Sequence, residues 1–67
     1  MRLHPTLTLA RIMAACERHV SSLDDPGFCV ACGADAEGIE PDAAGYRCDA
    51  CGDMAVYGAE ELLLRLA

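Results

Sequence analysis

The feature that most constrains this chain is a motif of cysteine, any two residues, cysteine and glycine, which occurs twice. The first copy covers Cys29–Gly33 and the second Cys48–Gly52, with fifteen residues between the two cysteine pairs. Two residues between cysteines let one tight turn present both sulfurs to the same ion, and this overall spacing is typical of four-thiolate zinc sites. The sequence therefore predicts one zinc ion held by four sulfurs. The predicted ligands are Cys29, Cys32, Cys48 and Cys51.

The glycines that end the two motifs, Gly33 and Gly52, fit the same interpretation. A turn that wraps backbone N–H groups around a sulfur ends in a positive φ, which glycine adopts without steric cost. Those N–H groups would offset the negative charge on the sulfurs. A disulfide framework is disfavoured because the five cysteines are an odd number. Iron in the same geometry remains an alternative, since the ligand type does not separate it from zinc. The small number of aromatic residues, three, and the short spacing favour zinc.

The length of the chain explains why a metal would be needed. Its 67 residues leave room for one small domain, and twelve of its apolar residues are alanines, which bury little surface. A domain below about 70 residues gains roughly 3–5 kcal/mol from its core, whereas structural zinc contributes about 10–16 kcal/mol. We therefore expect the metal to replace a larger core.

The residues before the motifs predict an amphipathic helix over about 7–22, capped by Thr6 or Thr8. We expect its apolar stripe to pack within the chain, with Cys16 as a small core residue rather than a reactive thiol. An alternative is that most of this stripe, including Ile12, stays exposed as a partner or dimer surface. The opposite face carries Arg11, Ala15, Arg18 and Ser22. The predicted stripe consists of Leu9, Ile12, Met13, Cys16, Val20 and Leu23.

The rest of the chain predicts short strands and a second helix. Residues 41–45 are interpreted as a hairpin turn, and 59–67 as a helix that buries Leu62, Leu63 and Leu66 while Leu64 points away. We expect a small metal-stabilised α+β fold in which residues 1–26 form a helical arm, 27–58 a zinc ribbon and 59–67 the final helix, together one compact domain. The predicted strands are Gly27–Cys29, Gly38–Glu40, Tyr46–Cys48 and Met54–Tyr57.

Charge is distributed unevenly along the chain. The net charge is −6, the sum of +2 over residues 1–23 and −8 over residues 24–67. Because nucleic-acid affinity comes largely from Lys and Arg, the acidic body is a poor candidate for that role. In a nucleic-acid function, Tyr46 would be available for base stacking. The phosphate contacts would be Arg2, Arg11, Arg18 and Arg47.

Two further features concern location and the histidines. Residues 1–16 loosely imitate a secretion signal that ends in a lipid-acceptor cysteine, but Arg11 interrupts the apolar stretch. We therefore expect a cytoplasmic protein without a membrane partner, since no stretch approaches the ~18 apolar residues of a membrane span. His4 and His19 are expected at the surface, because four cysteines already complete a tetrahedron.

At the two cysteine motifs the chain resembles the zinc-ribbon class, whose rubredoxin-like knuckles sit at the tips of hairpins and hold one metal. The stretch from Cys29 to Glu61 is similar to small uncharacterised zinc-ribbon proteins of bacteria and their phages. The resemblance implies a ribbon fold and four zinc ligands, and it implies little about function.

The functional expectation is a zinc-stabilised interaction module, a protein-binding adaptor rather than an enzyme. Four thiolates leave a metal no open position for catalysis, and no grouping of serine, histidine and aspartate suggests a nucleophile. The alternative is a nucleic-acid-associated zinc ribbon, in transcription or in a phage-related process. The sequence does not set the oligomeric state.

Overall fold

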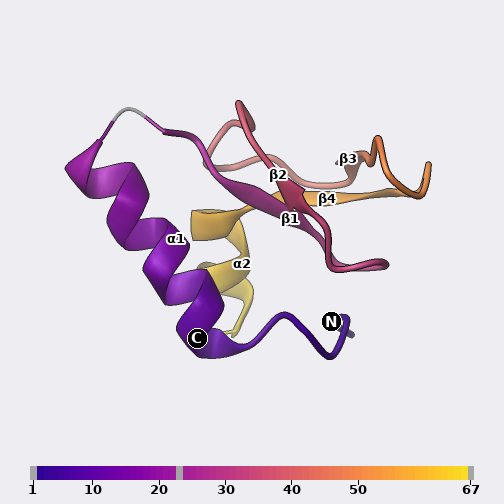
Figure 1. Ribbon diagram of the computed structural model, residues 1–67, viewed down its shortest axis with the longest axis horizontal. Helices are drawn as coiled ribbons and strands as arrows, with labels where there is room; N and C mark the ends of the chain where they lie inside the picture. Colours follow the sequence, from indigo (N-terminus) through magenta and orange to yellow (C-terminus); the bar gives the residue numbers. More distant parts are fainter. Residues whose placement is uncertain (1, 23, 67) are drawn as a thin grey trace.

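The computed structural model describes residues 2–22 and 24–66 and shows a four-stranded antiparallel sheet with two helices at one end. Figure 1 shows the strands reaching away from the helices, with the turns that follow β1 and β3 at the far end. This arrangement confirms the predicted α+β class. The elements are α1 (Leu9–Ser21), β1 (Gly27–Cys29), β2 (Asp35–Ala36), β3 (Tyr46–Arg47), β4 (Met54–Gly58) and α2 (Ala59–Leu66).

The strand order, β2-β1-β4-β3, explains how distant cysteines meet. Cys29 at the end of β1 is paired with Val56 of β4, and Tyr46 of β3 is paired with Val56 from the other side. Each cysteine motif connects two paired strands, β1 to β2 and β3 to β4, as expected for knuckles at hairpin tips. The inner strand β4, paired with both β1 and β3, therefore holds the two motifs next to each other.

Two local predictions in the loop after β2 are wrong. Residues 38–40 form no strand, because the N–H of Cys29 bonds the Ala34 carbonyl at 3.0 Å and pairing starts directly after the first motif, at Asp35. The turn at 41–45 does not join paired strands, because β3 pairs with β4 and not with β2. Instead this loop packs on the start of α2, where the Pro41 carbonyl accepts the N–H of Glu61 at 3.1 Å.

Helix α1 forms where the sequence predicts it, but it presents a different face to the core. Thr8 caps its N-terminus by accepting the N–H of Arg11, as expected. The buried residues are Ile12 and Ala15, whereas three members of the predicted stripe are exposed, Leu9 at 54%, Met13 at 48% and Val20 at 83%. The stripe prediction is therefore wrong by roughly a quarter turn of the helix. Leu23 lies outside the described residues.

The core is divided into two clusters. The helical cluster joins both helices to β1 through Phe28, and Cys16 packs against it half-buried. The second cluster lies under the cysteine motifs around Val56. The apolar core of each cluster is small, as the alanine-rich composition predicts. The buried members of the helical cluster are Leu7, Ile12, Ala15, Phe28, Ala59 and Leu62.

Helix α2 is as short as expected and depends on its packing. It buries Leu62, half-buries Leu63, and leaves Leu64 73% and Leu66 40% exposed. Leu66 is thus more exposed than predicted, and Ala67 lies outside the described residues. Neither helix in the described ranges has the length and apolar character that crossing a membrane would require.

Candidate metal centre

The two motifs place four cysteine sulfurs around one point at the end of the sheet away from the helices. Cys29 ends β1, and Cys32 lies in the turn that follows it. Cys48 follows β3, and Cys51 lies in the turn before β4. All four sulfurs lie within 4.8 Å of one another. The structure thus brings together the four residues that the sequence predicts as ligands.

The distances between sulfurs suit a metal better than disulfides. The Sγ atoms of Cys29 and Cys51 are 3.7 Å apart, as are those of Cys32 and Cys48. A disulfide requires about 2.05 Å, whereas a tetrahedron with metal–sulfur bonds of about 2.3 Å has sulfur–sulfur edges of about 3.8 Å. All four cysteines are free thiols. The four sulfurs are therefore positioned to hold one ion.

Backbone N–H groups point at the sulfurs, as expected for knuckles. The N–H groups of Ala50 and Cys51 lie 3.3 and 3.5 Å from the Sγ of Cys48. The Cys51 N–H, followed by that of Ala50, lowers the pKa of Cys48 to about 7, because each stabilises the thiolate against the effect of burial. The cluster thus favours one thiolate even before an ion is considered.

The Cys51 thiol resists ionisation because it is crowded by the other sulfurs. The Asp53 N–H lowers the pKa of Cys51, but burial and the thiols of Cys29, Cys32 and Cys48 outweigh it and raise the pKa to about 12. A second negative charge is thus unfavourable without a cation to compensate it. A divalent ion supplies that compensation and keeps coordinating thiols deprotonated. The donor set fits a thiophilic ion such as zinc or iron, and four sulfurs complete its tetrahedron.

The two knuckles have the same internal geometry. The N–H of Gly33 bonds the Cys29 carbonyl at 2.8 Å, and the N–H of Gly52 bonds the Cys48 carbonyl at 2.9 Å. Both glycines have positive φ, 78° and 82°, as the sequence predicts. Each motif therefore folds locally in the same way.

Their surroundings differ. The N-terminal segment covers the first knuckle, where the His4 N–H bonds the Val30 carbonyl at 2.8 Å and the Thr6 side chain lies against Gly33. Figure 1 shows this segment running from α1 toward the turn after β1. The second knuckle is open, since a Cβ at Gly52 would meet no described atom within 4 Å and Cys51 is exposed. The site is thus sheltered on one side and accessible on the other.

Arg11 is the residue that sequence reasoning missed at this site. Placed on the solvent face of its helix by periodicity, it is half-buried and reaches the first knuckle, where it bonds the Gly33 carbonyl at 3.1 Å and Asp35 at 2.8 Å. Its guanidinium also stacks on Phe28, 4.8 Å from the ring centre. No spacing rule signals this role, because Gly33 and Asp35 are more than twenty residues away.

The histidines are not part of the cysteine cluster, and each bonds groups near it at the surface. Nδ1 of His4 is 2.8 Å from the Thr6 hydroxyl. The His19 ring lies 3.1 Å from Asp25 and 3.3 Å from Glu60, and so links α1 to the segment before β1 and to α2. The pKa of His19 is raised, first by the Asp24 carbonyl that accepts from the ring and then by the two carboxylates. Both histidines are partly exposed, the His19 side chain at 28%, in agreement with the expectation that they lie at the surface.

Comparisons with protein-family models, with curated proteins and with solved structures find no match to this chain. The class therefore rests on the fold and the cysteine geometry alone. A small sheet with two cysteine turns at its tips is consistent with a zinc-ribbon-like knot. The resemblance to bacterial and phage proteins stays a prediction.

Proposed function

We propose that this chain is a zinc-stabilised protein-binding adaptor, in which a structural four-thiolate site replaces most of a core. The single observation that carries the metal part is the gathering of four sulfurs within 4.8 Å at hairpin tips. Four protein ligands close the coordination shell, so the proposed role is structural and not catalytic. The small apolar clusters support this role, because roughly 3–5 kcal/mol from a core is little beside about 10–16 kcal/mol from zinc.

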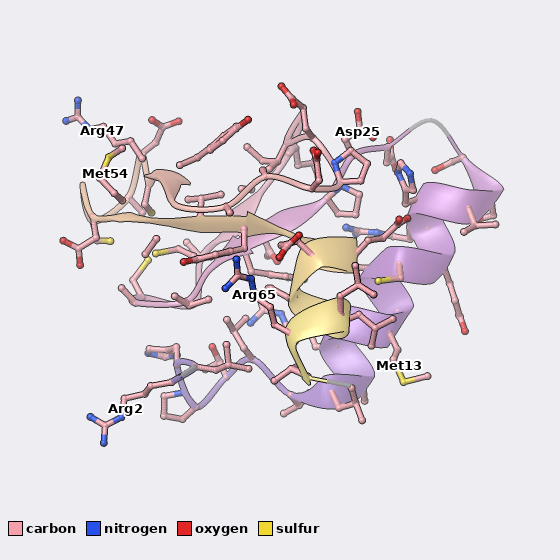
Figure 2. All side chains as sticks on the ribbon, turned by 180° about the vertical axis from the view of Figure 1, so that it is seen from behind. Arg2, Met13, Asp25, Arg47, Met54 and Arg65 are labelled. Atoms are coloured by element: carbon pink, nitrogen blue, oxygen red, sulfur yellow. The ribbon has the colours of Figure 1, made fainter. Side chains whose placement is uncertain are left out.

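The adaptor part is supported by apolar side chains that the fold leaves uncovered. In the part of the chain that the structure describes, five of the seven exposed large apolar side chains lie on the two helices. Between the helices is a hollow of about 330 Å³, and Figure 2 shows Met13 projecting outward beside it. Exposed apolar surface of this kind marks interaction sites. The hollow is lined by Met13, Cys16, Glu17, Val20 and Leu63.

The shape and charge of this hollow, here called the helix groove, suggest what it binds. Leu9, Met13 and Val20 lie on one side of α1, with Cys16 between them, at the four- and three-residue spacing that faces another helix in coiled coils. Glu17 lines the groove, and Glu60 lies close enough to add to the effect of burial in raising the pKa of Cys16. We therefore propose an amphipathic helix with basic flanking residues as the partner. In a symmetric dimer through this groove, a second copy would bring its own Glu17 and Glu60 against these carboxylates.

The structure gives weaker support to the nucleic-acid alternative than the sequence does, because fewer arginines remain for phosphate contacts. Arg11, one of its four expected phosphate contacts, is bound to Asp35 and Gly33. Arg65 is 2.6 Å from Glu61 and stacks on Tyr57. The remaining arginines, Arg2, Arg18 and Arg47, are too few for binding at about 150 mM salt against this net charge. Retention on DNA or RNA at that salt concentration would reverse the ranking.

Two measurements test the proposal. Metal analysis of the protein purified from its own cell without added metal is expected to give one zinc per chain, and iron or no metal would contradict it. Binding of partners, identified by mass spectrometry, is expected to fall at least about tenfold for Met13→Glu, because a charge would enter the apolar groove. Met54→Glu is the matched control, since Met54 is 67% exposed at the far end of the ribbon (Figure 2).

The two variants also test whether the helix groove is the binding surface and whether its partner is another protein or a second copy of this chain. Both variants should retain zinc and thermal stability, because the side chain of Met13 is 48% exposed and that of Met54 is 67% exposed. Equal loss of binding in the two variants would remove the helix groove as the binding surface. A wild-type dimer that Met13→Glu dissociates would replace the heterologous partner with a second copy.

A further inference from the structure

The Arg11 side chain connects three parts of the molecule that are far apart in the sequence. One terminal nitrogen, Nη2, donates to the Gly33 carbonyl at 3.1 Å and to Asp35 Oδ1 at 2.8 Å. The other, Nη1, donates to the Thr6 carbonyl at 3.2 Å. The guanidinium plane lies over Phe28 in the helical cluster. A side chain on α1 therefore bonds the N-terminal segment, the first knuckle and the strand that follows it.

The atoms that Arg11 contacts on the knuckle are placed by the metal ligands. Gly33 directly follows Cys32, and its N–H bonds the Cys29 carbonyl at 2.8 Å. Val30, between the two ligands, accepts the His4 N–H through its carbonyl. When the sulfurs of Cys29 and Cys32 are drawn to one ion, the carbonyls of Val30 and Gly33 are thereby held where the N-terminal segment and Arg11 can bond them.

Helix α1 needs such external contacts to stay in place. It has 13 residues, a length at which an isolated helix is marginal, and only Ile12 and Ala15 are buried along it. The helix groove exists only while α1 lies beside α2, since its lining comes from both helices. Contacts that hold α1 therefore also hold the proposed binding surface.

We propose that metal loading of the first knuckle controls the docking of α1 through Arg11, so that the helix groove is complete only in the metal-bound chain. This inference rests on the metal site of the proposed function and adds its regulation. Arg11 is a positioning residue, since it acts on the ligands through Gly33. The coupling is reciprocal: metal favours docked α1, and docked α1 raises metal affinity by the same factor.

The second knuckle provides the comparison within the same chain. Arg47 is exposed and directly precedes the ligand Cys48, and Figure 2 shows it at the far end of the ribbon, away from both helices. An arginine near a ligand thus occurs twice, but only Arg11 joins a knuckle to α1. Arg47→Met is therefore the matched control for Arg11→Met, because the two variants make the same chemical change.

The experiment measures zinc affinity by competition with a chelating indicator, and hydrogen-exchange protection of the α1 amides with and without zinc. Arg11→Met keeps an apolar side chain over Phe28 and removes the donors, so we expect zinc affinity to fall about 10- to 100-fold. Arg47→Met should change it about twofold or less. In the wild type, stripping the metal should abolish the protection of the α1 amides.

The outcomes separate this inference from the proposed function. Equal zinc affinities for the two methionine variants, or α1 amides that remain protected without metal, would overturn the coupling while the metal site stands. A wild-type chain that binds no zinc would overturn the proposed function itself. If Arg11→Met does not fold, Asp35→Asn replaces it, since Asp35 is exposed and its loss removes only the charge partner of Arg11. Asp35→Asn is then expected to weaken zinc binding more than Arg47→Met, and equality with Arg47→Met would again overturn the coupling.

Discussion

The two cysteine knuckles have the same motif and the same internal hydrogen bond, yet they differ in their contacts with the rest of the molecule. The first is covered by the N-terminal segment and bonded by Arg11. The second ends at Gly52, which is exposed and has open space where a side chain would be. The motif therefore determines how each knuckle folds, whereas contacts from distant residues determine how firmly it is held.

Because of this difference, we expect the two knuckles to depend on different contacts for their stability. Because the first knuckle shares contacts with α1, its order is expected to depend on both the metal and the helical cluster. The second knuckle is anchored through Cys48, which packs with Val56 and Cys29 in the second cluster. We therefore expect the two halves of one site to respond unequally to the same perturbation.

The largest effect is expected from removing the metal. Chelation should unfold residues 27–58, because about 10–16 kcal/mol of binding free energy is lost from a chain with a small core. With increasing chelator, the Gly52 amide should exchange with solvent before the Gly33 amide, as measured by hydrogen exchange with NMR detection. An amide spectrum that the chelator leaves unchanged would contradict the structural role of the metal, and simultaneous exchange of both amides would contradict the asymmetry.

A smaller effect is expected from alanine at the two knuckle glycines. Both substitutions strain a positive φ, at a cost of about 1–2 kcal/mol. At Gly33 the new methyl would also overlap the Thr6 hydroxyl and lie 2.7 Å from His4 Nδ1, which adds roughly 1–3 kcal/mol. Denaturant unfolding of the zinc-loaded variants should therefore rank Gly33→Ala as less stable than Gly52→Ala.

A third glycine serves as a control for this comparison. Gly38 also has a positive φ and open space around it, but it lies outside both knuckles. Gly38→Ala should thus match Gly52→Ala. Equal stability of the Gly33 and Gly52 variants would show that the N-terminal segment does not restrict the first knuckle.

The smallest effect is expected from His19, which joins the helical layer without touching either knuckle. Its folded-state pKa is raised above its ordinary value of about 6.5, first because the Asp24 carbonyl accepts from the ring and then because Glu60 and Asp25 lie nearby. The resulting stabilisation is fully present below about pH 6.5 and is lost as pH rises through the folded-state pKa.

Melting temperatures of zinc-loaded wild type and His19→Gln measure this contribution. The wild type should melt higher at about pH 6, and the difference should shrink as the pH rises above the ordinary value of about 6.5. The pH dependence of zinc binding is common to both proteins and cancels in the difference. A difference that grows with pH would contradict the sign of the pKa shift.

Local patterns accounted for much of the fold. The capping threonine, strand β1, the two knuckles and the start of α2 all follow from residues that interact with near neighbours. The four candidate ligands follow from spacing, because each cysteine pair lies within one turn. Where the outcome depended on which distant strand pairs with which, as for residues 38–45, the prediction was wrong.

The face of α1 shows most clearly why the rest could not be predicted. Periodicity places Leu9, Met13 and Val20 on an apolar stripe, and a stripe is usually buried. In this chain the favourable contacts of Arg11 with Phe28, Gly33 and Asp35 turn that arginine inward. Leu9, Met13 and Val20 are left exposed, and among the described residues of the stripe only Ile12 is fully buried. An amphipathic pattern reflects only the free energy of transferring each side chain to an apolar phase. It contains no information on the hydrogen-bond, ion-pair and stacking partners that the fold brings close to a side chain.

The sequence by itself determined the four candidate ligands, the knuckles and the helices, because turn geometry and helix capping act over a few residues. Only the tertiary structure decided that the two knuckles differ, that Arg11 belongs to the first of them, and that a groove opens between the helices. These features depend on contacts across more than twenty residues, where the position of one element is set by the packing of all the others.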